Sequence, residues 1–514
     1  MPPGWGPGET YQPPENRSGR ISALLNLIAV HSSSASKITL HGVSKRVSGI
    51  PTHYKTIYEL APLIESGDIS PVELTQSQLA RIELLDGKLK SYATVTADLA
   101  LEQARTAERE IGEGRYRGKL HGIPIAVKDL CNTAGIKTMG GSAVFANNVP
   151  DHDATVVANL RTAGSVLLGK LNMTEGAMGG YNPKLDIPEN PWRASHWAGA
   201  SSSGSGSATA AGLAYGTLGS DTGGSIRHPA AVCGTVGLKP TWGRVSRFGV
   251  MDLAESLDHV GPLTRSAADA GIILQAIAGH DPIDPTSLPH SVPNMLSEIG
   301  KGVEGLKIGW DEDYAISGME PSFAAAVESG VKVMEGLGAE IVPVKMPEIM
   351  RDAMDAWPVI CSSEAAMAHS ETFPSHAAEY GPFFREWLEM GRSHSATDYA
   401  RAHSLRITLN GELRKTMRNI DVLACPSTAK ASYPVTPEAL YGPISPSRNP
   451  WDSRFTVPYD FSGLPTITLP CGLDNNGMPV SLQFAGHHLS EPLLVGIGDT
   501  FERATDFHKL HPPV

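Results

Sequence analysis

Residues 198–240 read AGASSSGSGSATAAGLAYGTLGSDTGGSIRHPAAVCGTVGLKP. Glycine and serine dominate the start of this stretch, as they would in a flexible linker. The linker interpretation fits poorly, because residues 208–218 are mostly small and apolar and predict a tightly packed helix that leads into a buried strand. The turn 221–225 follows this run and ends on Ser225. We therefore expect residues 208–218 to be packed in the protein interior and not to form a linker.

The turn carries the features of a nucleophilic site. Ser225 follows two glycines directly, so backbone without a Cβ lies where a substrate would approach. A nest that would bind the oxyanion of a tetrahedral intermediate can form from four consecutive backbone N–H groups, those of Thr222, Gly223, Gly224 and Ser225. Serine is a weak nucleophile without a base, so the turn also predicts a base elsewhere in the chain.

A lysine is the best candidate for this base. His228 follows Ser225 too closely in the chain to reach back to it. Lys128 ends the apolar run 123–127, which predicts a buried strand. Burial there would lower the pKa of the lysine and favour its neutral, basic form. From the run alone, a strand-end lysine that reaches solvent is the more ordinary alternative.

Three segments, in this order and spacing, resemble the amidase signature family of serine hydrolases: GIPIAVKDL (122–130), GASSSGS (199–205) and GSDTGGSIRHPAAVCGTVGLKPTWGRVS (219–246). The similarity extends from about Ile57 to the C-terminus. One departure is Ala200, where the family usually has glycine, and its methyl group removes no catalytic function.

The resemblance implies a role for each of several residues. Ser225 would be the nucleophile, Ser201 a bridging serine that follows a cis peptide bond, and Lys128 the base. It also implies that the segment before the serine stretch lines the acyl side of the pocket. The substrate-binding candidates are Met178, Tyr181 and Ser202, although core packing explains Met178 equally well.

The implied activity is hydrolysis of an amide bond that is not a peptide bond in a protein, through an acyl-enzyme and without a metal or other cofactor. The same three residues suffice for the hydrolysis of esters and carbamates in this family. One alternative in the family is the amidase subunit of the glutamine-dependent tRNA amidotransferase. The sequence of this chain differs from that subunit in three segments: EGAMGG (175–180), LDHVGPLT (257–264) and the region 347–420. Another alternative is a non-catalytic binding protein on the same fold, which would not need Lys128 in an apolar strand.

Composition narrows the class of partner. The net charge of −12 without a basic block argues against nucleic acid as a partner. No run approaches the roughly 20 apolar residues of a membrane span. The five cysteines are scattered without metal-site spacing, as in a reduced cytoplasmic protein. With no charged cluster near the motifs, we expect a small, neutral, partly aromatic amide as substrate.

Helical and strand-like segments alternate along the chain. This alternation predicts an α/β fold with a mixed central sheet, and the resemblance implies helices on both of its faces. Residues 1–50, rich in Pro, Gly and Ser, predict a flexible extension, and 51–514 a single amidase signature domain. Within the extension, the run 21–30 is compatible with a helix that docks on the partner chain of a homodimer.

Three further segments carry specific expectations. Residues 307–344 predict a βαβ unit that forms a semi-independent lobe, and 253–264 a turn in which His259 is structural. The helical, aromatic-rich region 347–420 predicts a cover over the pocket, with 373–401 as its mobile part.

Overall fold

The computed structural model describes residues 51–446 and 449–514, so the expectations for residues 1–50 lie outside it. A mixed 11-stranded sheet runs through the described residues in the order β1-β3-β2-β4-β6-β5-β10-β11-β9-β7-β8. Its strands are β1 (Tyr92–Val95), β2 (Pro124–Lys128), β3 (Val166–Leu171), β4 (Gly216–Asp221), β5 (Val236–Lys239), β6 (His259–Thr264), β7 (Lys307–Trp310), β8 (Glu340–Pro343), β9 (Val422–Pro426), β10 (Thr466–Leu473) and β11 (Pro479–Gly486).

The α-helices are α1 (Ile57–Glu65), α2 (Pro71–Leu89), α3 (Ala97–Gly112), α4 (Thr155–Thr162), α5 (Ser203–Ala210), α6 (Arg227–Cys233), α7 (Ala267–Ile277), α8 (Glu312–Ala315), α9 (Pro321–Gly336), α10 (Met350–Ala368), α11 (Pro382–Ser393), α12 (Ala396–Thr416), α13 (Pro437–Tyr441), α14 (Val457–Ser462) and α15 (Glu491–Ala504). Short 3-10 helices occupy Thr52–Tyr54, Ala143–Phe145, Glu175–Ala177, Ala377–Glu379, Pro450–Ser453 and Phe507–Lys509. Among the described residues, no helix combines the length and apolarity that a membrane crossing needs.

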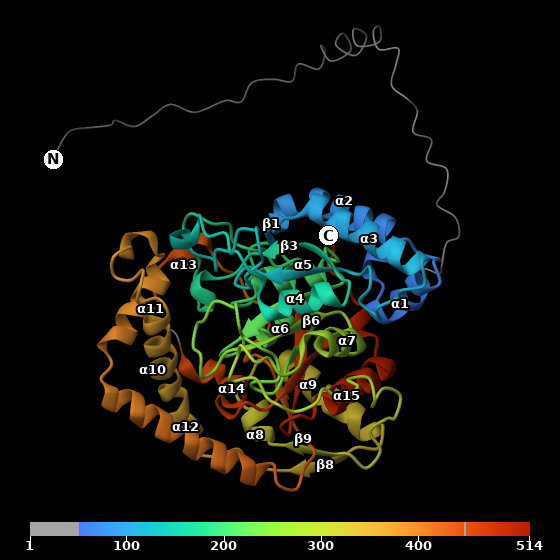
Figure 1. Ribbon diagram of the computed structural model, residues 1–514. Helices are drawn as coiled ribbons and strands as arrows, with labels where there is room; N and C mark the ends of the chain where they lie inside the picture. Colours follow the sequence, from blue (N-terminus) through green and yellow to red (C-terminus); the bar gives the residue numbers. More distant parts are fainter. Residues whose placement is uncertain (1–50, 447–448) are drawn as a thin grey trace, which may run out of the picture. The chain divides into compact units, whose positions relative to one another are not determined.

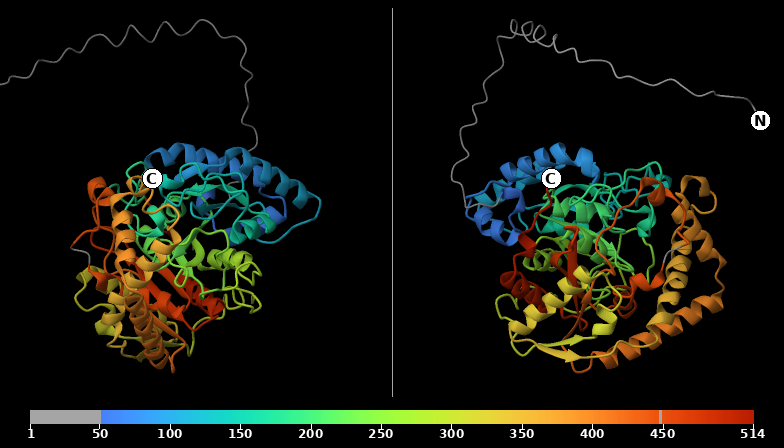
Figure 2. Two further views of the ribbon diagram at one scale, coloured as in Figure 1. Left: turned by 60° about the vertical axis from the view of Figure 1, so that its left-hand side comes forward. Right: turned by 180° about the vertical axis from the view of Figure 1, so that it is seen from behind.

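Strand β2 shows how the sheet separates two hydrophobic layers. Ile125 and Val127 point into a large cluster with residues of α1, α4 and α7. Ala126 points the other way, into a cluster with residues of α2, α3 and α5. Because side chains alternate along a strand, Lys128 starts on the side of Ala126 and α5. Figures 1 and 2 show the helices over both faces of the sheet, so the predicted fold class is confirmed.

The glycine- and serine-rich stretch forms α5 and β4 in the core. Every residue of α5 is buried. A Cβ on Gly204 would lie 2.4 Å from the Asn172 carbonyl oxygen, and one on Gly206 would lie 2.9 Å from the Pro229 side chain. Small residues are therefore needed here because neighbouring backbone approaches the helix closely, which is why the linker interpretation is wrong.

Three sequence expectations differ from the structure. The predicted turn at 253–264 continues into strand β6, which pairs with both β4 and β5. The strand is not recognisable from the sequence, because Gly261 and Pro262 both disfavour strands. The apolar run from Phe455 to Gly472 predicts a strand along its whole length, but it begins with α14 and β10 starts only at Thr466. The βαβ unit at 307–344 is not a separate lobe, since β7 pairs in parallel with β9 of the same sheet.

The region 347–420 forms three helices, α10, α11 and α12, which Figure 1 shows in yellow-brown to orange along one side of the described domain. Helix α10 packs against both of the others. The contact between α10 and α11 is close at Gly391, where a Cβ would lie 1.9 Å from the Ser362 carbonyl oxygen. The helices therefore form one packed layer with α10 innermost.

Candidate active site

Lys128 lies at the end of β2 with no exposed surface. Its Nζ donates hydrogen bonds to Ser201 Oγ at 2.6 Å and to Ser220 Oγ at 2.9 Å. Burial lowers the pKa of Lys128 to about 7, against the opposing influence of Cys131 and of nearby carboxylates. A large fraction of this amine is therefore neutral near pH 7 and has a lone pair that can take a proton.

A second buried lysine shows what is particular about the first. Lys170 on β3 lies with its Nζ 3.3 Å from Asp129 Oδ1 and donates to Thr138 Oγ1 at 2.6 Å. Among the described residues, Lys128 forms no such ion pair, and its hydrogen-bond partners are hydroxyl groups. Burial lowers the pKa of Lys170 too, but the Asp129 carboxylate opposes this effect directly, whereas Lys128 has no carboxylate in contact within the described part of the chain.

Ser201 stands just before α5 and follows a cis peptide bond from Ala200. Its carbonyl oxygen accepts a hydrogen bond from the Thr174 N–H at 3.2 Å, and its side chain is fully buried. The close packing of α5 holds this position beside the end of β2. The structure therefore brings Ser201 and Lys128 together as the motif order predicts.

The turn with Ser225 is fixed by the carboxylate of Asp221. Asp221 Oδ1 accepts from the Gly224 N–H at 2.6 Å, and Oδ2 accepts from the Ile226 N–H at 2.9 Å. The Gly224 N–H, one of the four predicted oxyanion donors, is therefore already engaged by a carboxylate. Ser225 keeps 9% of its surface exposed, more than Lys128 or Ser201. It is thus the residue of the three nearest to solvent.

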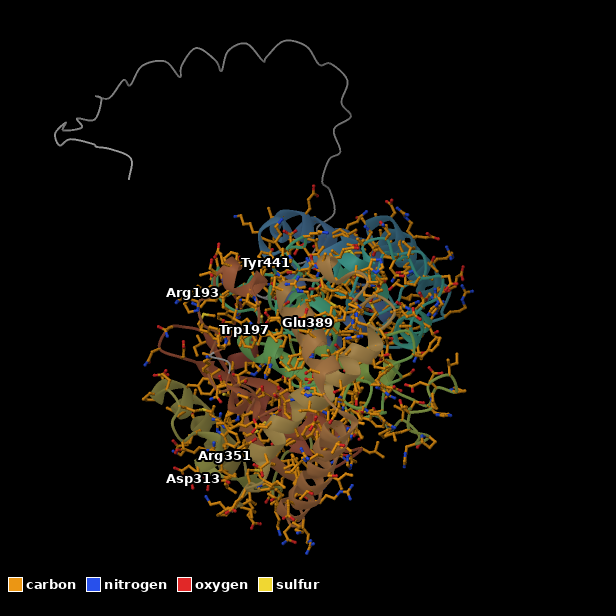
Figure 3. All side chains as sticks on the ribbon, turned by 90° about the vertical axis from the view of Figure 1, so that its left-hand side faces the viewer. Arg193, Trp197, Asp313, Arg351, Glu389 and Tyr441 are labelled. Atoms are coloured by element: carbon orange, nitrogen blue, oxygen red, sulfur yellow. The ribbon has the colours of Figure 1, made fainter. Side chains whose placement is uncertain are left out.

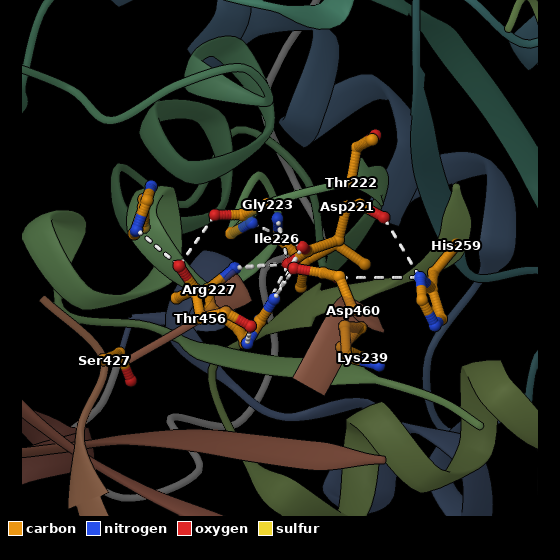
Figure 4. A network of polar contacts seen from close by, with 12 residues as sticks. Asp221, Thr222, Gly223, Ile226, Arg227, Lys239, His259, Ser427, Thr456 and Asp460 are labelled. Atoms are coloured by element: carbon orange, nitrogen blue, oxygen red, sulfur yellow. Dashed lines mark hydrogen bonds and ion pairs between the residues drawn. The ribbon is translucent and has the colours of Figure 1, made fainter. Parts of the chain in front are cut away.

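Asp221 is held in turn by a buried guanidinium (Figure 4). Arg227 donates from Nε to Asp221 Oδ2 at 2.9 Å and from Nη2 to Asp460 Oδ2 at 2.7 Å. Burial alone would raise the pKa of Asp221, but the Arg227 guanidinium outweighs it and holds this pKa well below its usual range. The sequence analysis did not identify this network, although a carboxylate at a strand end six residues before an arginine was a usable signal.

The three predicted substrate-binding residues lie close to this site, but their side chains contact other groups of the protein. Met178 is buried in the large hydrophobic cluster. The Tyr181 hydroxyl donates to Ser203 Oγ at 2.8 Å. Ser202 Oγ donates to the Ser220 carbonyl oxygen at 3.2 Å, which joins the start of α5 to β4. Contact of these residues with a substrate stays a prediction.

Tyr181 also borders a pocket of about 160 Å³. Its lining includes the aromatic and aliphatic side chains of Trp197, Leu440 and Tyr441. Figure 3 shows Trp197 and Tyr441 on the same side of the molecule. The Trp197 ring also lies 5.9 Å from that of His228, whose imidazole covers Gly224. The pocket is therefore bordered by residues that reach the Ser225 turn.

The helical region 347–420 also contacts the site. Trp357 of α10 donates from Nε1 to the Thr222 carbonyl oxygen at 2.9 Å. Glu175 accepts from the Gly381 N–H at 2.7 Å, and the Phe384 ring occupies the space where a Gly176 side chain would lie. Most of the aromatic residues proposed for the cover are buried in the core cluster: Tyr380, Phe384 and Trp387.

No group of three or more His, Cys, Asp or Glu side chains within residues 51–446 and 449–514 is arranged to hold a metal ion.

Known proteins resemble the chain over nearly all of the described residues. A family model described as Amidase matches residues 73–495. A putative amidase, AmiD of Mycobacterium tuberculosis, is 42% identical over 89% of this chain and 95% of its own length. A glutamyl-tRNA(Gln) amidotransferase subunit of Chloroflexus aurantiacus is 36% identical over 90% and 98%. The native peptide amidase of Stenotrophomonas maltophilia has a similar structure, with a TM-score of 0.78 and 31% identity over 90% and 98%.

Proposed function

This chain belongs to the amidase signature family and is an amidase, and we propose that it cleaves small amides with Ser225 as the nucleophile, Ser201 as the proton carrier and Lys128 as the base. The observation that carries this proposal is the environment of Lys128. A buried amine without a carboxylate partner, 2.6 Å from a serine hydroxyl, has the protonation state and the contact that a general base needs.

In the acylation step, neutral Lys128 takes the proton of Ser201 Oγ while Ser201 takes the proton of Ser225 Oγ. Ser225 Oγ forms a bond to the carbonyl carbon, and the electron pair of the C=O bond moves to the oxygen. Since Gly224 is engaged by Asp221, we assign the stabilisation of this oxyanion to the N–H groups of Thr222, Gly223 and Ser225.

Collapse of the tetrahedral intermediate breaks the C–N bond. The proton held by Lys128 returns through Ser201 to the leaving nitrogen, so the amine departs neutral and an acyl ester of Ser225 remains. Water then attacks this ester, gives one proton to the same relay, and displaces Ser225 Oγ, which regains its proton. The products are a carboxylic acid and an amine, and the protein returns to its starting state.

We further propose that the substrate is neutral and partly aromatic. The pocket lined by Trp197 and Tyr441 supports this, because flat aromatic side chains favour flat apolar ligands. A homodimer also remains a prediction, which the mass of the purified full-length chain in solution tests.

The test compares hydrolysis of a neutral aryl anilide, a small aliphatic amide and L-glutamine by the full-length chain, with peptide mapping of the acylated residue. We expect the anilide to have the highest kcat/KM and the acyl group to be on Ser225. Preference for glutamine would favour the amidotransferase-like alternative. Tight binding without release of any amine would favour a binding protein.

A further inference from the structure

A small cavity is bordered by Ser220, the hydrogen-bond partner of Lys128 that the proposed relay does not use. Its volume of about 10 Å³ is close to the space that one water molecule needs. Ser220, which accepts a hydrogen bond from Lys128, lines the cavity together with Asp258 and His259. His259, one of the lining residues, has a buried Nε2 atom without a hydrogen-bond partner among the described residues.

Asp258 is built rigidly into this wall. Its Oδ1 accepts from Thr222 Oγ1 at 2.5 Å. Its Oδ2 accepts from the N–H groups of Leu253 at 2.9 Å and Ala254 at 3.1 Å. These three donors orient the carboxyl group whether or not it is charged. Burial raises the pKa of Asp258 to about 7, so this group and Lys128 change charge over the same range.

Asp221 acts on Lys128 more strongly than Asp258 does, but only Asp258 changes its own charge over this pH range. Asp221 also faces Lys128, but the Arg227 guanidinium already neutralises it. Asp258 forms no ion pair among the described residues; the charged groups that act on it are Asp252 and, more weakly, Arg247. Cys131 also faces Lys128, but burial raises the pKa of this thiol to about 11, so it is neutral over the same range.

We propose that Asp258 is a positioning residue that sets the pH range over which Lys128 is neutral, acting across this cavity through Ser220. The inference rests on the proposed role of Lys128 as base. When Asp258 is ionised, its negative charge holds the proton on Lys128 and delays the formation of the basic amine. The two groups therefore titrate as a pair and not independently.

The experiment replaces the carboxyl group by an amide. In Asp258→Asn, the side-chain oxygen can still accept from Leu253 and Ala254, and the NH₂ group can donate to Thr222 Oγ1. Two rates are measured between pH 5 and 10: turnover of an anilide and labelling of Ser225 by a fluorophosphonate. We expect the acidic limb of both profiles to move to lower pH by about one unit and to become a single titration, with the plateau rate within about threefold of the wild type.

Asp252→Asn is the matched control, because Asp252 lines the same cavity but reaches the surface. The acidic limb of the pH profile of Asp252→Asn should move by less than half as much as that of Asp258→Asn. An unshifted limb in Asp258→Asn with a retained plateau overturns the proposal. If the asparagine variant unfolds, Asp258→Ser removes the charge with a smaller side chain, and the same shift is required of it.

Lys128→Arg separates this inference from the proposed function. If that variant is inactive and Asp258→Asn shows no shift, only the role of Asp258 is wrong. If Lys128→Arg keeps its activity, the base has been misassigned and both proposals fail.

Discussion

The roles that we propose for Ser225 and Ser201 differ, so the same substitution should affect them differently. Ser225→Ala removes the bond-forming oxygen, and we expect kcat/KM to fall by at least about 10³-fold with normal folding. Ser201→Ala interrupts proton transfer but leaves the nucleophile, so a loss of about 10²–10⁴-fold is expected. Anilide kinetics and intact-mass analysis measure both, and an acyl adduct found on Ser201 would reverse the assignment.

The proposed role of Lys128 leads to a specific pH dependence of the hydrolysis rate. The pKa of Lys128 is lowered to about 7, so the neutral fraction, and with it the rate, should fall below pH 7, approach a tenfold loss per unit once Asp258 is also protonated, and level off above pH 7. Lys128→Arg should be nearly inactive at every pH, since a guanidinium does not give up its proton. Lys184→Arg, at an exposed position, is the control and should keep the wild-type profile.

For single residues, short motifs predicted the local structure around residues that are close together in the sequence. The apolar run before Lys128 predicted the strand, although from the run alone a lysine that reaches solvent was the more ordinary expectation. The two glycines before Ser225 predicted the turn. The partners that hold the turn could not be predicted in the same way. Asp460 is 233 positions from Arg227, and no local pattern marks it as the acceptor of that guanidinium.

Among the elements, α11 allows the covering role to be tested against a purely structural one. Phe384 is fully buried and fills the space above Gly176, whereas the adjacent Phe383 is half-buried and lies against Gly179 and Gly180. Phe384→Ala should lower the free energy of unfolding by about 3–5 kcal/mol and reduce all rates together. Phe383→Ala should change the ratio of kcat/KM between a bulky anilide and a small amide, with little loss of stability.

Thermal unfolding and the two substrates, with fluorophosphonate labelling as a measure of Ser225 reactivity, separate these outcomes. Equal losses of all three rates in both variants would show that α11 acts only as part of the core. The mobility of residues 373–401 remains a prediction, because close packing against Glu175 and Gly176 describes one arrangement and not its rate of opening.

The elements that the sequence predicted best are those with strong local signals. Ser70 at an N-cap position followed by Pro71 predicts a helix start, and α2 does begin at Pro71 with Ser70 as its N-cap. Strand β6 was missed because its pairing with β4 and β5 compensates for a proline and a glycine that disfavour strands in isolation. Tertiary contacts of this kind cannot be derived from a single segment.

For the whole chain, we predict that residues 1–50 are dispensable for chemistry. The proposed catalytic residues and the match to the family model, residues 73–495, all lie beyond them. A chain that starts at Pro51 should hydrolyse a small amide with kcat within about twofold of the full-length protein. Light scattering on both forms reports the assembly. A severalfold fall in kcat with the assembly unchanged would contradict this prediction.

The bond between Arg227 and Asp460 has a consequence for the synthesis of the protein. A ribosome that adds about 5–20 residues per second needs roughly 10–50 s to pass from one to the other. During that time the nascent chain already contains Lys128, Ser201 and Ser225, but lacks the carboxylate that completes the network behind the turn. The turn that carries Ser225 therefore gains the last carboxylate of its buried network only when α14 has been made, near the end of synthesis.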